Sequence, residues 1–153
     1  MSGNNFELGK TRLPGLTPEV AQESRQFLLD NNHILRRGVR IEKDSTDDSH
    51  TGKEYKLQPG LALVRIEEGA NKGKYVPPDH ADAPDAGDVV MAGILMEYVD
   101  MRKRSDPEDV EDQQASVLIH GKVDAAQIIY ADASYEDEIK DVLPGVFFEV
   151  EQP

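Results

Sequence analysis

The amino-acid sequence predicts a mainly β protein with minor α structure. Short runs rich in Val, Ile and Leu recur along the chain, separated by turns that contain Gly, Pro and Asp. Apolar residues at helical spacing occur in two segments, 18–29 and 132–141. Aromatic residues make up 6% of the 153 residues, so we expect a core built from aliphatic side chains.

The composition narrows the class of protein. A chain of 153 residues fits one domain with an appendage. No apolar run is long enough to span a membrane, and residues 1–5 lack the features of a signal peptide, so we expect a soluble intracellular product without a membrane partner. The chain has no cysteine, which excludes disulfides, thiolate metal sites and a cysteine nucleophile.

The charge is strongly negative and unevenly distributed. The formal net charge is -13, which would repel a phosphate backbone, so we expect no nucleic-acid partner. Residues 1–43 carry seven basic and five acidic residues, a net of +2, and the remaining 110 residues carry ten and twenty-five, a net of -15. This asymmetry is either ordinary surface variation or a means of docking the N-terminal part on an acidic surface.

Residues 1–16 predict a flexible N-terminal arm, because Gly, Asn, Ser and Pro interrupt any sustained period. Within it, Phe6-Glu7-Leu8 is either part of a disordered tail or a short strand that pairs with a partner's sheet.

Residues 17–56 predict an N-terminal extension made of a helix, a strand and a loop. Thr17 and Pro18 are typical of a helix start, and the helix is expected over 18–29. The residues Val39-Arg40-Ile41 predict a strand with one solvated face. The nearby arginines belong to that solvated face or to salt bridges between subunits, since no glycine-rich phosphate loop adjoins them. Residues 44–56 form a polar loop without the ligand spacing of a calcium site.

Residues 57–153 predict a β-rich body. Strands are expected at 61–67 and up to Val76, joined by a turn at 68–73, and at 89–99, which should form the centre of the sheet. Gly93 indicates a bulge or a close backbone approach. After a loop at 100–114, the body continues with strand-like runs at 115–120 and 122–129, broken at Gly121, a short helix within 132–141 and a final strand at 146–150.

No catalytic or cofactor-binding residues stand out, and we expect no cofactor, no metal site and no enzymatic activity. The glycines at 69 and 73 are spaced one residue too closely for a phosphate loop, and Tyr75 stands where a magnesium-binding Ser or Thr belongs. In the acidic loop at 79–88, His80 lies among four aspartates, which is the composition of either a carboxylate metal site or, as we expect for a Pro/Ala-rich loop, a solvated loop. The acidic run at 106–112 reads as a flexible loop, because nothing indicates the apolar pocket that separates the pKa values of a catalytic carboxylate pair.

Four motifs follow one another in the body: Leu57-Gln58-Pro59-Gly60-Leu61, Gly73-Lys74-Tyr75-Val76, the strand from Ala92-Gly93-Ile94-Leu95 to Asp100, and Val117-Leu118-Ile119-His120-Gly121-Lys122-Val123. In this succession, from about residue 57 to 150, the chain resembles the head decoration protein D family of tailed bacteriophages, typified by that of phage lambda. The resemblance implies a small β-clip-like body and an N-terminal arm. It also implies homotrimers that sit outside the expanded head at local threefold axes and stabilise the shell.

The resemblance also implies the partners and the contact residues. The partners are the major capsid protein and further copies of this chain, on the outer surface of a virion assembled in the host cytoplasm. The residues expected to contact the capsid are Asn5, Phe6, Leu8, Lys10, Arg12 and Leu13. Those expected at a trimer or inter-trimer interface are Phe27, Arg36, Arg37, Arg40 and Phe147.

Two other functions are alternatives to a decoration protein. A trimeric dUTP-hydrolysing enzyme shares the clip-type architecture, but the Asp, Ser and Tyr motifs of its phosphate site are not found. Another virion-surface module, a fibre adaptor or host-glycan binder, would need an exposed aromatic platform, for which the five tyrosines are the candidates.

Overall fold

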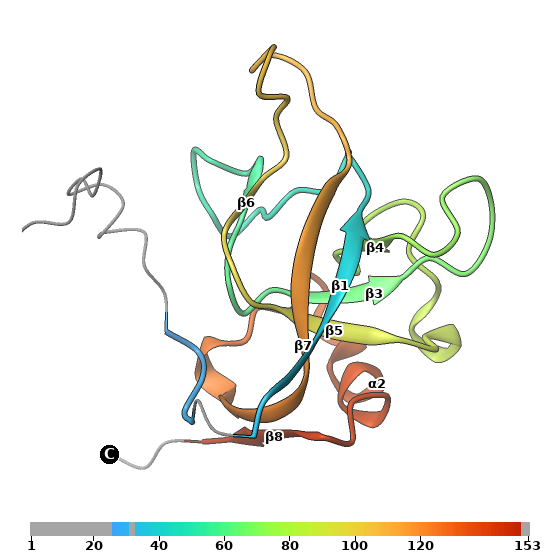
Figure 1. Cartoon of the computed structure of the whole chain (residues 1–153). Coiled ribbons are helices and arrows are strands. Elements are labelled where there is room, and N and C mark those ends of the chain that lie inside the picture. The colour runs from blue at the N-terminus through green and yellow to red at the C-terminus, as the bar shows by residue number, and fades with distance from the viewer. Residues whose placement is uncertain (1–25, 31–32, 151–153) are drawn as a thin grey trace, which may run out of the picture.

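The computed structural model describes residues 26–30 and 33–150, which form a mainly β fold with one short α-helix (Figure 1). This confirms the predicted mainly β class with minor α structure. The helix is α2 (Glu136–Asp141), and 3₁₀ turns lie at Ala86–Asp88, Ala125–Gln127 and Ala133–Tyr135. The strands are β1 (Leu35–Ile41), β2 (Lys56–Leu57), β3 (Ala62–Arg65), β4 (Tyr75–Val76), β5 (Ala92–Leu95), β6 (Val99–Asp100), β7 (Gln113–Asp124) and β8 (Val146–Glu149).

Six strands form one barrel-like sheet in the order β1-β4-β3-β5-β7-β8, and β7 also pairs back to β1. The two edges of β1 are paired to different extents. The antiparallel β1–β7 pairing runs along all of β1, whereas β1 meets β4 at the single pair Ile41↔Tyr75. Strand β8 runs parallel to the end of β7, and β2 pairs with β6 in a separate two-stranded ribbon.

The central strands β3 and β5 are buried on both faces, which explains why the sequence shows continuous apolar runs there instead of alternation. Val64 and Ile94 belong to one core cluster, which also contains Ile139 and Leu143 from the region of α2. Leu63 and Leu95 belong to a second cluster, which the ribbon and β1 complete with the buried side chains Leu57, Val99, Val39 and Ile41.

Several predicted elements are confirmed. Strands β3 and β4 form the expected antiparallel hairpin, and β5 lies between β3 and β7 near the centre of the sheet. The predicted single strand 89–99 is wrong in its bounds, because the chain leaves the sheet after Leu95 and Val99–Asp100 form β6 in the ribbon with β2. Gly93 marks a close approach, because a Cβ atom there would lie 2.5 Å from Cγ2 of Val117. The predicted short helix is present as α2, and Ile139 in it is fully buried.

The predicted break at Gly121 is wrong, because β7 continues through it to Asp124. Gly121 has φ +153, a conformation that L side chains rarely adopt, so glycine keeps the strand continuous here instead of ending it. The second predicted run, 122–129, ends early, because the chain turns into a 3₁₀ turn at Ala125–Gln127.

The C-terminal part of the predicted helix 18–29 is also wrong. Residues 26–29 are not helical, and Leu28 forms an antiparallel bridge with Val123. The bonds Leu29 N–H to Lys122 O (3.0 Å) and Asp124 N–H to Phe27 O (2.9 Å) fix this pairing. Residues 18–25 lie outside the described residues, as does the predicted arm.

The segment predicted as an extension, 17–56, contributes β1 to the same sheet as the body. In the described part of the chain, no helix is long and apolar enough to cross a membrane.

Candidate interaction surfaces

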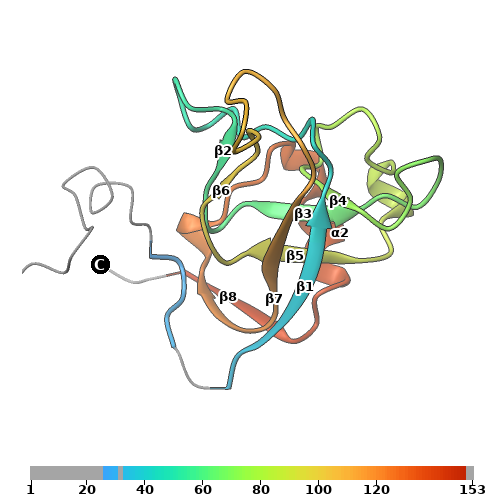
Figure 2. The same cartoon turned by 45° about the horizontal axis from the view of Figure 1, so that its top comes forward.

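The first half of β1 is exposed and contains two of the predicted interface residues, Arg36 and Arg37. Residues 35–38 are all exposed, whereas Val39 and Ile41 further along are buried. Strand β1 crosses β3 and β5, and its N-terminal half extends beyond them (Figures 1 and 2). Strand β7 pairs with this half, and no other strand of the described residues lies along its second edge. We call residues 35–38 the β1 overhang.

The overhang carries two cations and one large apolar side chain. Leu35 is 57% exposed, and Arg36 and Arg37 follow it on opposite faces of the strand. Within residues 26–30 and 33–150 neither arginine forms an ion pair, although acids outnumber bases in the chain by thirty to seventeen. Arg40, the third predicted interface arginine, lies further along and approaches the carboxylate of Asp112 at 3.7 Å.

The two predicted interface phenylalanines differ in their surroundings. Phe27 is 4% exposed and belongs to the first core cluster of its own chain. Phe147 is 57% exposed on β8 and faces outward opposite Lys122. The next residue, Phe148, packs against the first core cluster, as expected for neighbours on opposite faces of a strand. Phe147 is therefore available for contact, and Phe27 supports the fold.

The predicted capsid-contact residues Asn5, Phe6, Leu8, Lys10, Arg12 and Leu13 lie outside the described residues. Their role stays a prediction.

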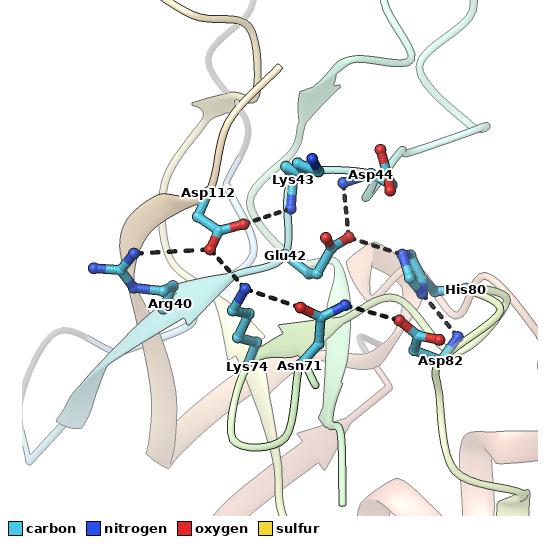
Figure 3. Close-up of polar contacts among 9 residues, drawn as sticks. All are labelled: Arg40, Glu42, Lys43, Asp44, Asn71, Lys74, His80, Asp82 and Asp112. Carbon is cyan, nitrogen blue, oxygen red and sulfur yellow. Dashed lines mark hydrogen bonds and ion pairs between the residues drawn. The ribbon is translucent and has the colours of Figure 1, made fainter. Parts of the chain in front are cut away.

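A polar network, which the sequence did not reveal, joins four loops at the C-terminal end of β1 (Figure 3). Asp112 is its centre. It accepts a hydrogen bond from the backbone N–H of Lys43 (2.9 Å) and forms an ion pair with Lys74 Nζ (2.8 Å). Burial on its own would raise the pKa of the Asp112 carboxyl, but the Lys74 contact, the Lys43 amide and the charge of Arg40 together lower it below its ordinary value.

The network continues through the β3–β4 hairpin into the loop after β4 (Figure 3). Lys74 donates to Asn71 Oδ1, and Asn71 donates to Asp82 Oδ2, both at 3.0 Å. The backbone N–H of Asp82 donates to Nδ1 of His80, so Nε2 of the neutral ring carries the hydrogen that faces Glu42 Oε2 at 3.1 Å. Glu42 is 2% exposed, and its pairing with His80 fastens the loop at 79–88 to β1.

A second buried acid, Asp47, fastens the loop between β1 and β2. Its carboxylate accepts from the Ser49 amide (3.1 Å) and from Gln58 Nε2 (3.0 Å). Asp47 is 2% exposed, so these bonds replace the water that the carboxylate loses on folding. The pattern Asp-x-Ser is a signal for such a turn, but the contact with Gln58 cannot be read from the sequence.

Two acidic hollows lie on the loops beside this network. The first has a volume of about 240 Å³ and is lined by Glu67, Glu68, Asp82, Ala83, Pro84, Asp85 and Asp88; we call it the acidic groove. The second, of about 470 Å³, is lined by Asp44, Thr46, Asp48, Asp79, His80, Ala81 and Asp82. Burial, together with the charge of Asp48, raises the pKa of Asp79 there. Among the described residues no three His, Cys, Asp or Glu side chains are placed to hold a metal ion.

The tyrosines do not form one platform. Tyr75 and Tyr135 are buried, and Tyr130 is partly buried against the first core cluster. Burial raises the pKa of the Tyr130 hydroxyl. Tyr55 and Tyr98 flank the β2–β6 ribbon, where the guanidinium of Arg102 lies 3.9 Å from the centre of the Tyr55 ring. Tyr98 lines a groove of about 580 Å³ beside residues 102–104.

No protein-family model matches this chain, and no curated protein matches its sequence. The resemblance to the head decoration protein D family therefore stays a prediction from the order of the sequence motifs.

Proposed function

We propose that this chain is a capsid decoration protein. In this proposal it binds the outside of the mature, expanded phage head as trimers at local threefold axes and stabilises the shell. Its N-terminal arm contacts the major capsid protein, and its β-clip-like body covers the lattice. The virion is its site of action, and it acts as a structural protein without catalysis.

The observation that carries the proposal is the order of elements in the body. The first motif that carries the resemblance lies at the end of β2 and in the turn before β3, and the others lie in β4, in β5 to β6, and in β7. All four belong to one folded unit, and α2 and β8 follow in the order that the resemblance implies. The motifs coincide with successive elements of one folded unit, divided between the six-stranded sheet and the β2–β6 ribbon, and such a succession supports a shared architecture better than scattered matches would.

The exposed surfaces support a binding role as well. The β1 overhang comes directly after the N-terminal segment, and Phe147 presents an apolar side chain on the last strand. Exposed arginine and aromatic side chains are enriched at protein interfaces. A protein that binds the expanded lattice and not the unexpanded one would stabilise the expanded state by linkage, and many copies would multiply the effect.

Deleting residues 1–16 tests the role of the arm. We expect the shortened protein to lose binding to expanded shells of the major capsid protein, while its circular dichroism spectrum and melting temperature stay those of the full chain. A variant with the same sixteen residues in scrambled order controls for length and charge. Undiminished pelleting of the shortened protein with expanded shells would contradict an arm-mediated contact.

A second candidate is a virion-surface adaptor that binds a fibre protein or a host glycan. The groove beside Tyr98 favours it, because Tyr98 lines this hollow together with polar side chains, and a glycan binder needs an accessible aromatic residue beside hydrogen-bonding groups. Binding to host-cell oligosaccharides that Tyr98→Ala abolishes, without any binding to shells, would favour this function over cementing.

A further inference from the structure

We infer that copies of this chain contact each other head to tail, with the β1 overhang of one copy seated in the acidic groove of the next. The inference rests on the proposed trimeric assembly and names the two surfaces that would build it. The partner is therefore a second copy of this chain, recognised by charge and by a small apolar contact.

The overhang has the features of a surface that a partner covers. By strand alternation, Leu35 and Arg37 lie on the same face of β1 as Val39 and Ile41. Val39 and Ile41 are buried, whereas Leu35 and Arg37 are exposed. Strand β1 holds three arginines and no acid. Within the described residues Arg37 has no ion-pair partner. The planar guanidinium of an exposed arginine can bind a partner's carboxylate through two parallel hydrogen bonds.

The acidic groove is complementary to the overhang. Glu68, Asp85 and Asp88 are exposed on its walls, and no cation of the described chain pairs with them. The residues from 67 to 88 carry six acids against two lysines, a net of -4. Ala83 and Pro84 complete the lining, so the groove offers an apolar contact for Leu35 beside carboxylates for Arg37.

The proposed contact joins two different surfaces, so it is not a symmetric pairing of one surface with itself. The overhang and the groove are different surfaces of one copy, formed by β1 and by the loops around β4 (Figures 1 and 2). A contact between two different surfaces is heterologous, and it closes into a ring when the rotation between copies allows. Three such contacts give a trimer in which every overhang and every groove is occupied.

Engineered cysteines test the contact, because the chain has none of its own. Arg37→Cys and Asp85→Cys are prepared as two proteins, each with one exposed thiol; Asp85 makes no side-chain cap bond, so its replacement leaves the turn intact. The proteins are oxidised separately and as an equal mixture, in free solution and on expanded shells. We expect cross-linked dimers from the mixture and none from either protein alone.

Charge reversal provides an independent readout. Arg37→Glu should weaken self-association by about tenfold or more, measured by sedimentation velocity in solution and by copy-to-copy cross-linking on shells. Glu68→Arg with Asp85→Arg should weaken it similarly, and a chain with all three changes should regain association. The matched controls are Arg104→Glu, an exposed arginine on the 100–114 loop, and Asp48→Arg in the other acidic hollow.

The outcomes separate this inference from the proposed function. Cross-linking of the mixture on shells, in solution or in both supports the inference. No cross-link in either setting, or equal cross-linking of Arg37→Cys alone, overturns it. If wild-type protein still pellets with expanded shells in that case, the cementing function stands and only the assignment of the trimer contact fails.

Discussion

Replacing Gly93 with alanine tests the closest approach between two central strands. The added Cβ would lie 2.5 Å from Cγ2 and 2.6 Å from Cβ of Val117, whereas real Cβ contacts essentially never fall below 3.0 Å. A rotation of the Val117 side chain moves its methyl groups but not its Cβ. Strands β5 and β7 would therefore have to separate, which opens the pairs Ile94↔Leu118 and Leu95↔Val117.

The expected cost is large for a single methyl group. Overpacking a core typically costs 1–3 kcal/mol, and a clash with an atom fixed to the backbone belongs at the upper end, so we expect a loss of about 3 kcal/mol. This corresponds to a folding constant reduced roughly 150-fold. For a domain of this size it lowers the melting temperature by roughly 6–12 °C. Urea titration and thermal denaturation, both followed by circular dichroism, measure the two quantities.

A control and a rescue make the prediction specific. Gly38→Ala has no heavy atom within 4 Å of the added Cβ and should leave stability unchanged or raise it by about 0.4–1 kcal/mol. Val117→Gly removes the clashing Cβ, so it should cost less in the Gly93→Ala protein than in the wild type, whereas Val117→Ala keeps that atom and should give no relief. A loss below about 0.5 kcal/mol for Gly93→Ala, or equal costs of Val117→Gly in both backgrounds, would refute the reasoning.

Three further substitutions test the polar contacts, all by urea titration. Asp112→Asn should cost about 1 kcal/mol at pH 7. The pKa of Asp112 is lower in the folded protein than the value of about 3.9 in the unfolded chain, so the carboxylate contributes its full stabilisation above about pH 3.9. This stabilisation is lost as the pH falls through the folded pKa. A stability difference between Asp112→Asn and wild type that persists below about pH 2 would contradict this. Tyr135→Phe removes the bond to Pro84 O (2.6 Å) and should cost about 1 kcal/mol, and no change would mean that the bond does not fasten the 79–88 loop. Asp47→Ala removes the buried carboxylate that Ser49 and Gln58 bind and should cost about 2 kcal/mol; a cost under about 0.5 kcal/mol would show that water replaces the carboxylate.

The strands of the body could be predicted because their signal is local. Strand β3 and the segment around β5 are apolar runs flanked by Gly, Pro and Asp, and each is buried on both faces. Gly93 could be recognised as a close approach from its position inside such a run. The hairpin turn between β3 and β4 uses Gly69 and Gly73 at φ +90 and +92, which only glycine adopts without strain.

The failures arise where distant parts of the chain decide local structure. Leu28 fits a helical period, but pairing with Val123 makes its segment extended, so a long-range bridge overrides the local pattern. A glycine inside a strand pattern indicates a break at Gly121, yet β7 continues through it because residues 121–124 pair with β8. In both places the partner is far away in sequence, and periodicity contains no information about it.

The polar network could not be predicted for the same reason. Glu42, His80 and Asp112 come from three loops separated by more than thirty residues, and each looks like one of many surface charges in an acidic chain. The acidic groove was likewise read as a solvated loop, because the contribution of Glu67 and Glu68 to its wall depends on how the β3–β4 hairpin folds over residues 82–88. The sequence predicts a solvated face for the arginines around β1, but alternation does not explain why Arg36 and Arg37, on opposite faces, are both exposed.

Co-sedimentation of the purified protein with expanded and unexpanded shells of the major capsid protein encoded beside it tests the central claim most directly. The proposal predicts saturable pelleting with expanded shells and none with unexpanded shells, because the binding site is formed by expansion. Absence of pelleting with either shell would contradict a decoration function, and the fibre or glycan role would then be tested next.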